Sequence, residues 1–393
     1  MRAFFLIFAI CILHYSYMLG QGPSRVGTNQ LILFQQGFVL ESLSGFGFSN
    51  AAKSSVYNIG SANPALLSDF VKPSIEISYQ YNTQIDSFIL NDMTFQRVNN
   101  FVPQAGGVVY PINDFRIGGA FSQKYSGEMR IEDIPITTPQ DPDGTGEYFS
   151  YSRENSIYSV SAIAAYQFGN LFYQRDRLSI GLQFNLNYLV FRESLYRLLA
   201  KMNASATNWK VGLTYGAGEG FLERFRIGIY METRAHFSDF LQYDDGLLIH
   251  DLNPGNNQII NGIVPQEFEW TTVVPMRFGL GYLIRVSSKF EIGSDFIHTW
   301  WEDMGNGYSN GLDFSHSLMY TFSEKNLMSL GFFYSQDNNE SPYSPAANAV
   351  FLSTGLVYRV GKLEVHLAVA DSHIFSGKLA RQTVGKMGVG FNL

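Results

Sequence analysis

Apolar and polar residues alternate along most of the chain after residue 72. The clearest segment is residues 178–190, where apolar residues occupy the even positions and polar or small residues the odd positions up to Asn187. Residues 75–81, 225–234 and 362–369 show the same alternation. A period of two places successive side chains on opposite faces of a strand. The pattern predicts a chain built mainly of β-strands.

The strands are long, and their length separates two architectures. We expect fourteen of them, at residues 73–82, 103–111, 115–125, 156–168, 177–190, 206–216, 223–239, 267–284, 289–302, 311–322, 325–336, 348–360, 361–374 and 384–393. Strands of soluble sheets usually have about 5–6 residues, whereas a strand that crosses a membrane needs about 9–11. The length favours a membrane barrel, whose apolar face meets lipid, over a soluble sandwich.

The connections between these strands are alternately short and long. Short turns are expected around Asn113 and at residues 169–176, and long connections at residues 126–155 and 191–205. Short periplasmic turns that alternate with longer outer loops are typical of outer-membrane barrels. We therefore predict an all-β fold, a transmembrane outer-membrane β-barrel of about fourteen antiparallel strands with a plug inside it.

Composition agrees with this fold and excludes one class of partner. Of the 393 residues, 15% are aromatic and only 16% are charged, against about 25% charged in soluble domains. A barrel with aromatic belts explains both values. The net charge of −7 gives no basic surface for nucleic acid, so we expect no nucleic-acid partner.

The first 20 residues read as a secretion signal. Arg2 precedes an apolar run at residues 3–13, which has the length of a signal-peptide core and is too short to cross a bilayer. Cys11, the single cysteine, lies inside this run. The mature chain is therefore expected to have no disulfide and no thiolate metal site.

Residues 21–72, here called the N-terminal segment, precede the first strand and do not alternate. Residues 45–70 are rich in small residues and contain the triplet Asn63-Pro64-Ala65. An Asn-Pro pair favours a turn or a helix start. A segment with this much apolar content would not stay solvated as a free tail, and a barrel this wide must be filled or leave a channel. We expect three parts: signal peptide 1–20, plug 21–72 and barrel 73–393.

Two stretches resemble a known family. Residues 37–79 (GFVLESLSGFGFSNAAKSSVYNIGSANPALLSDFVKPSIEISY) and 271–304 (TTVVPMRFGLGYLIRVSSKFEIGSDFIHTWWEDM) are similar to the long-chain fatty acid transporter family, which is FadL-like and has toluene and xylene uptake relatives. The resemblance implies a monomer in which a hatch shifts, so that hydrophobic molecules captured among the outer loops pass an inner pocket and leave sideways through the wall. It implies hatch roles for Asn63, Pro64 and Ala65, and we add Ser61 as a gating candidate.

The resemblance leaves other functions open. A related barrel could serve protein secretion as a cargo shuttle or assembly factor, and a general porin would need a plug that does not block the lumen. The preferred prediction is passive uptake of long-chain fatty acids or aromatic hydrocarbons.

Further candidates come from the residues themselves. Phe46 and Phe48 could contact a ligand or only pack the plug against the wall. Gly118 and Gly119 could kink their strand and open the wall, or form a small-residue packing site.

Residues 191–204 carry Leu195, Leu198, Leu199 and Met202 at helical spacing. This segment could be an outer lip that captures hydrophobic molecules, a helix that caps the barrel mouth, or a continuation of the neighbouring strands.

No pattern indicates an enzyme, and we expect no catalytic residue, metal or cofactor. The seven histidines form no metal-binding spacing. Inward charges could form a catalytic group, but pairing across the lumen is the simpler interpretation; these charges are Arg226, Glu232, Arg234, Lys362, Glu364 and His366. The last strand alternates to Leu393, like the signal that the barrel assembly machinery reads. The expected partners are a hydrophobic small molecule, outer-membrane lipid or lipopolysaccharide, and that machinery.

Overall fold

The computed structural model describes residues 59–82, 86–89, 93–96, 100–135, 146, 148–172, 175–195, 198–217, 225–244, 248–251, 260–263, 267–304, 309–323, 326–335, 348–376 and 383–393. The wall strands are β1 (Ser74–Asn82), β4 (Asn100–Ile112), β5 (Phe115–Pro135), β6 (Tyr148–Gly169), β7 (Arg177–Leu195), β8 (Leu198–Gly216), β9 (Phe225–Glu232), β10 (Ala235–Asp244), β13 (Glu267–Val274), β14 (Arg277–Arg285), β15 (Phe290–Thr299), β16 (Gly311–Ser323), β17 (Asn326–Ser335), β18 (Ala349–Val360), β19 (Leu363–Asp371) and β20 (Thr383–Asn392). The other elements are β2 (Asp86–Ile89), β3 (Met93–Gln96), β11 (Leu248–Asp251), β12 (Ile260–Ile263) and the 3₁₀ helices η5 (Pro64–Asp69) and η7 (Trp301–Met304).

The wall closes on itself. Consecutive wall strands pair antiparallel, and β1 pairs with β4 on one side and with β20 on the other. The chain passes from β9 to β10, and from β13 to β14, through two residues each time, so each pair is one interrupted strand. Within the described residues, fourteen antiparallel strands therefore form a closed barrel. The predicted fold class is confirmed.

The barrel has its apolar side chains outside and its polar side chains inside. On β7, Leu182 is 46% exposed, whereas Gln183 and Asn185 are fully buried. Buried and exposed positions also alternate along β18 and β19, although Phe351 and Val357 of β18 are apolar residues on the inner face. An apolar exterior around a polar interior suits a wall that faces lipid. No helix in the described part of the chain is long and apolar enough to cross a membrane.

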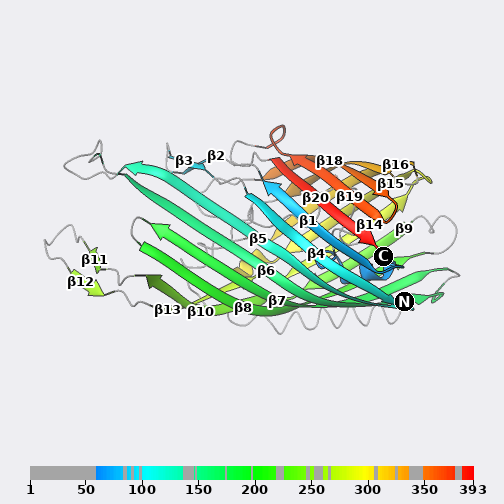
Figure 1. Cartoon of the computed structure of the whole chain (residues 1–393), viewed down its shortest axis with the longest axis horizontal. Coiled ribbons are helices and arrows are strands. Elements are labelled where there is room, and N and C mark those ends of the chain that lie inside the picture. The colour runs from blue at the N-terminus through cyan, green and yellow to red at the C-terminus, as the bar shows by residue number, and fades with distance from the viewer. Residues whose placement is uncertain are drawn as a thin grey trace.

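Four strands are much longer than the others. β5, β6, β7 and β8 have 21, 22, 19 and 19 residues, and Figure 1 shows them extending beyond the rest of the barrel at the end opposite the C-terminus. A membrane needs only about 9–11 residues of strand. Because the C-terminus lies at the short-turn end, the extended half of these strands projects on the outer side.

Two sequence-based expectations about these strands are wrong. Residues 126–135 and 148–155 are strand and not loop, because β5 pairs with β6 as far as Pro135↔Tyr148. Residues 191–195 and 198–205 are strand as well, because β7 pairs with β8 as far as Leu195↔Leu198. The extended hairpins keep their backbone groups hydrogen-bonded where loops were expected.

The helical interpretation of residues 191–204 is also wrong. Leu195 ends β7, while Leu198, Leu199 and Met202 belong to β8. Leu199 is 39% exposed and Met202 only 2%, as on the two faces of a strand. The third interpretation, a continuation of the neighbouring strands, is confirmed. The segment misled because the alternation is inverted here, with Met202 and Ala204 buried and Asn203 exposed. Its predicted role in capture remains a prediction.

Candidate functional site

The triplet Asn63-Pro64-Ala65 forms a capped helix start inside the barrel. The Asn63 side chain accepts a hydrogen bond from the Ala65 backbone N–H at 3.0 Å, and Pro64 is the first residue of η5. Proline suits that position because its fixed φ is already helical and its missing N–H would have no helical partner. η5 packs against β6, β7 and β8. The Asn-Pro pair thus starts a helix, as the sequence predicts.

Two glycines in the wall make room for this turn. Gly181 of β7 and Gly212 of β8 are direct cross-strand partners. A Cβ atom on Gly181 would lie 2.2 Å from the Ala65 nitrogen, and one on Gly212 would lie 1.8 Å from Asn63 Oδ1. No side chain fits at such distances. We call this pair the glycine notch; it lets the backbone of the triplet approach the wall directly.

Asn63 also bonds to the wall itself. Its Nδ2 donates to the carbonyl oxygens of Leu213 and Ile229, both at 3.0 Å. These two residues face each other across β8 and β9. The buried Asn63 side chain thus joins the turn to the wall by two hydrogen bonds and caps η5 by a third.

A belt of buried polar side chains holds the residues just before the triplet. Lys210 Nζ donates to the Ser61 carbonyl oxygen at 2.8 Å, and Gln183 Nε2 donates to the Gly60 carbonyl oxygen at 2.7 Å. Gln183 also reaches Asn185 at 2.7 Å. The N-terminal segment is therefore fixed here through its backbone, with little demand on its side chains.

The charge of Lys210 is balanced within the lumen. Glu232 at the end of β9 lies 3.3 Å from Lys210 Nζ and pairs with Lys124 of β5. Asn208 Nδ2 donates to the same carboxylate at 3.1 Å. A buried ammonium without such a partner would cost several kcal/mol. Glu232 thus joins β5, β8 and β9 around the N-terminal segment.

The predicted inward charges are paired where the structure describes them. Arg226 makes a two-pronged contact with Asp69 at the end of η5, at 2.7 and 2.8 Å. Glu364 lies 2.6 Å from His366. Lys362 differs from the expectation, because it lies exposed in the turn before β19. Among the described residues no three His, Cys, Asp or Glu come close enough to hold a metal ion.

The N-terminal segment also covers the inner face of β4 and β5. Ile59 lies against Gly107 and Leu67 against Gly118, where an added Cβ would be 2.9 and 3.0 Å from these side chains. Glu76 of β1 accepts a hydrogen bond from the Ile59 N–H at 2.7 Å. Gly118 is therefore a packing site, which was one of its two sequence-based interpretations.

No bulge lies at Gly118 or Gly119. The β5 register is regular across both residues on either side. The irregularity lies further along, where Lys124 has no partner position on β6 between the pairs Gln123↔Tyr158 and Tyr125↔Ile157. Lys124, the residue at this bulge, forms the ion pair with Glu232.

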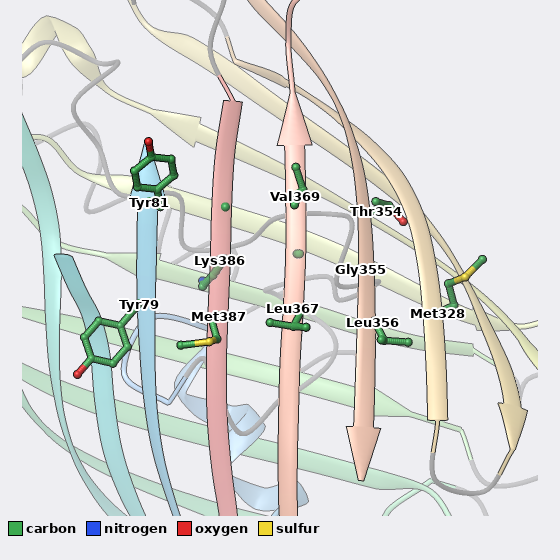
Figure 2. Close-up of a pocket in the computed structure, with 12 residues that line it drawn as sticks. Tyr79, Tyr81, Met328, Thr354, Gly355, Leu356, Leu367, Val369, Lys386 and Met387 are labelled. Atoms are coloured by element: carbon green, nitrogen blue, oxygen red, sulfur yellow. The ribbon is translucent and has the colours of Figure 1, made fainter. Parts of the chain in front are cut away.

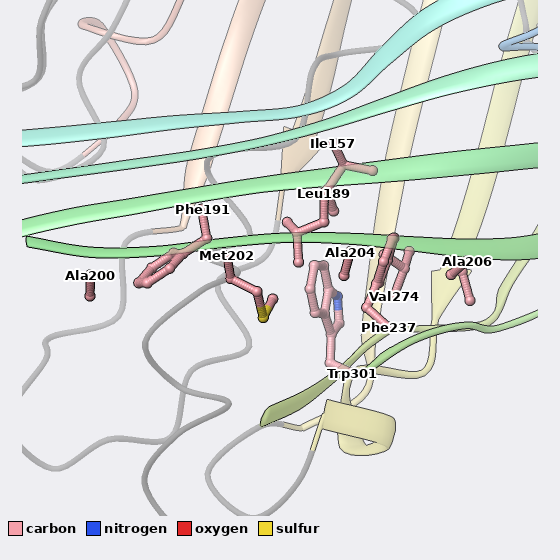
Figure 3. Close-up of a cluster of buried hydrophobic side chains, with 11 residues drawn as sticks. Ile157, Leu189, Phe191, Ala200, Met202, Ala204, Ala206, Phe237, Val274 and Trp301 are labelled. Carbon is pink, nitrogen blue, oxygen red and sulfur yellow. The ribbon is translucent and has the colours of Figure 1, made fainter. Parts of the chain in front are cut away.

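Further out, the inner wall changes from polar to apolar. Figure 3 shows eleven buried apolar side chains that we call the apolar cluster: Ile157, Leu189, Phe191, Ala200, Met202, Ala204, Ala206, Ala235, Phe237, Val274 and Trp301. On β7 the change occurs between Asn187 and Leu189, about 26 Å along the strand from Gly181 at about 3.3 Å per residue. The lumen thus offers an apolar surface outward of the polar belt.

Sequence reasoning missed most of this cluster. Met202 was a candidate, but as an outer capture residue, and Phe191, Phe237 and Trp301 were not singled out. The signal was present in the run Tyr188-Leu189-Val190-Phe191, where alternation stops because both faces become apolar.

Two hollows lie on the outer surface of the wall. One of about 580 Å³ is lined by outward side chains such as Leu367 and Met387, with Tyr79 and Tyr81 at one side (Figure 2). The other, about 380 Å³, lies over β1, β4 and β5 at Val108 and Gly119. Both face the lipid side, because exposed outward side chains such as Leu367, Met387 and Val108 line them.

Of the other predicted site residues, Ser61, Asn63, Pro64 and Ala65 are buried together at the notch. Phe46 and Phe48 lie outside the described residues, as does the signal peptide.

Comparisons with known proteins give matches among solved structures alone. No family model matches the sequence, and no curated protein does. A Pseudomonas aeruginosa FadL homologue matches with a TM-score of 0.63 and 12% identity, over 91% of this chain and 99% of that one. The Ralstonia pickettii toluene transporter TbuX gives 0.62 and 13%, over 91% and 99%. The Pseudomonas putida toluene transporter TodX gives 0.59 and 13%, over 90% and 98%.

At these identities the likeness is one of fold. It covers nearly the whole of each solved chain, and it agrees with the closed barrel and the lipid-facing exterior described above. The chain therefore has the FadL-like fold, a transmembrane β-barrel of the bacterial outer membrane.

Proposed function

We propose that this protein carries hydrophobic small molecules passively across the outer membrane, as a transporter and not as an enzyme. The observation that carries the proposal is the apolar cluster on the inner wall, outward of the polar belt. Burial of one CH₂ group is worth about 0.8 kcal/mol, so an apolar solute avoids a polar channel unless the wall offers apolar contacts.

The solved structures of similar fold support this substrate class. TbuX and TodX are toluene transporters, and CymD is a monoaromatic hydrocarbon channel. For this chain we propose a long-chain fatty acid or an aromatic hydrocarbon as the ligand, and a monomer as the working unit.

We further propose that residues 21–72 act as a hatch below the apolar cluster. Ser61, Asn63, Pro64 and Ala65 would hold it in the glycine notch until a ligand shifts it. The contacts at the notch are mostly hydrogen bonds to backbone atoms. Such contacts can be exchanged for water one at a time, which suits a part that moves.

Release would occur sideways, between β4 and β5. Within the described residues their register runs from Ile112↔Phe115 to Ala105↔Ser122. Beyond that point Phe101 and Val102 pair with β1, and Tyr125 pairs with β6. The outer hollow of about 380 Å³ lies just below this point and is lined by Gly118 and Gly119. Leu67 covers Gly118 from inside. We propose this seam as the exit, and lipid and the barrel assembly machinery as the other partners.

The test replaces one phenylalanine of the apolar cluster. Phe237 is fully buried in the lumen, whereas Phe240 on the same strand is 53% exposed. Burying a phenylalanine is worth about 1.5–3 kcal/mol, so Phe237→Ser should weaken ligand binding and uptake at least about tenfold. Phe240→Ser is the matched control and should leave both unchanged. Equal uptake by both variants, with both folded, would contradict the proposed path.

A further inference from the structure

The turn that carries Trp301 is fastened to two neighbouring breaks in the wall. β9 and β10 are interrupted at residues 233–234, and β13 and β14 at residues 275–276. Asp303 of η7 bonds to both, because its Oδ2 accepts from Arg234 Nε at 2.6 Å and from the Met276 N–H at 3.4 Å. The Trp300 N–H donates to the Met276 carbonyl oxygen at 3.0 Å.

Local chemistry explains why the strands break there. Pro275 has no N–H to give to a ladder. In the other strand, the Thr233 side chain accepts from the Trp209 N–H at 3.0 Å and donates to the Trp209 carbonyl oxygen at 3.3 Å, next to the backbone bond between the two residues. The breaks free the backbone groups to which η7 attaches.

This attachment places one side chain in the apolar cluster. η7 follows β15 in the outer connection to β16, so it is not part of the wall. Figure 3 shows the Trp301 indole pointing from η7 toward β7 and β8, beside Phe237 and near Met202 and Leu189. Trp301 is 3% exposed. Every other member of the apolar cluster comes from a wall strand.

We propose that Trp301 occupies the place of the ligand: a hydrophobic molecule binds the apolar cluster by displacing the indole, and the Arg234–Asp303 pair is the latch that returns it. The inference rests on the proposed function. It names the cluster formed by Met202, Phe237 and Leu189 as a subsite that accepts a flat apolar group of about the size of an indole.

The latch is suited to opening. The Arg234 side chain is 35% exposed and that of Asp303 is 11% exposed, so water can solvate both charges when they part. A partly exposed pair of this kind is weak. The triplet Asn63-Pro64-Ala65 differs from this latch, because Asn63 is only 1% exposed. η7 can therefore move without disturbing the glycine notch.

The first experiment follows the indole directly. The triple variant Trp209→Phe, Trp270→Phe and Trp300→Phe leaves Trp301 as the single tryptophan. Palmitate and toluene serve as probes with the purified full chain in detergent. Displacement predicts a red shift of the Trp301 emission and stronger quenching by acrylamide as either probe saturates. Unchanged emission under saturating probe would overturn the proposal.

The second experiment uses the direction of an affinity change. If Trp301 competes with the ligand, Trp301→Ala should tighten the apparent Kd about threefold or more, because the competing state is removed. A tryptophan that only supports the pocket would, when removed, weaken binding. Weaker binding by a folded Trp301→Ala protein contradicts the proposal.

A third experiment tests the latch with Trp301 in place, so its outcome does not depend on whether the Trp301→Ala protein folds. Cysteines at Arg234→Cys and Asp303→Cys, cross-linked by a short bis-thiosulfonate that forms one disulfide with each cysteine and releases sulfinate, keep Trp301 and fasten η7. Binding of both probes should be lost while the linker is intact and return on reduction; unchanged binding in the linked form overturns the latch. If the wild type takes up the probes but these three experiments give the opposing results, the displacement of Trp301 is refuted and the proposed function stands. If the wild type shows no uptake, the proposed function itself is refuted.

Discussion

Two glycines decide how close the triplet Asn63-Pro64-Ala65 can come to the wall. Gly181 and Gly212 present bare backbone at the point where the Asn63 side chain bonds to β8 and β9. The sequence shows both glycines as ordinary small residues within alternating strands. Their role could not be predicted, because it depends on a contact 149 positions away between Asn63 and Gly212.

At this scale we predict that Gly212→Ala displaces the triplet. A Cβ 1.8 Å from Asn63 Oδ1 cannot be accommodated, and overpacking of this kind costs about 1–3 kcal/mol. The free energy of unfolding in denaturant should fall by that amount, and ion conductance in planar bilayers should rise. Gly216→Ala on the same strand is the control, since its nearest neighbour would be 3.8 Å away. Equal conductance of the two variants would mean that the notch does not seat the triplet.

At the scale of the strands, the alternation of apolar and polar residues predicts most of the fold and fails at a few identifiable places. Fourteen strands and their order follow from the alternation, because one face meets lipid and the other the polar lumen. The pattern fails where both faces are apolar, as around Leu189 and Phe191. It inverts on the projecting part of β8, where apolar residues such as Met202 are buried and the helical spacing arises by chance. The interruption at Thr233 was hidden as well, because it depends on bonds to Trp209 of the neighbouring strand. Pro275 is a visible signal for the other interruption, because proline gives no N–H to a ladder.

The position of the membrane along β7 and β8 gives a prediction for these elements. Leu182 faces outward five residues from the periplasmic end of β7, near the middle of the expected bilayer. Leu182→Arg should lower stability in lipid by about 2–4 kcal/mol, the cost of a cation at the midplane. Leu199→Arg, equally outward but on the projecting part of β8, should cost far less. The measurement is denaturant unfolding in liposomes, and equal losses would show that the projecting hairpins do not leave the bilayer.

In the whole barrel, the polar belt holds the end of the N-terminal segment, and the apolar cluster lies on its outer side. The proposed exit, the seam between β4 and β5, lies beside it. If ligand leaves through that seam, a bulky group in the outer hollow near it should slow release. Gly119→Trp should reduce uptake several-fold, and binding should be unaffected because the apolar cluster is remote. Gly385→Trp fills the other hollow, opposite β1 and β19, and serves as the control. The measurement is uptake in vesicles by the two variants. An equal effect of Gly119→Trp and Gly385→Trp would refute an exit between β4 and β5.

The central claim concerns transport by the whole molecule, and one measurement tests it most directly. Purified protein in liposomes, without any energy source, is presented with a radiolabelled fatty acid and with toluene, while ion conductance is recorded on the same preparation. The account predicts uptake of at least one of the two above protein-free liposomes, together with little steady conductance. Large steady ion conductance without uptake of either compound would contradict it.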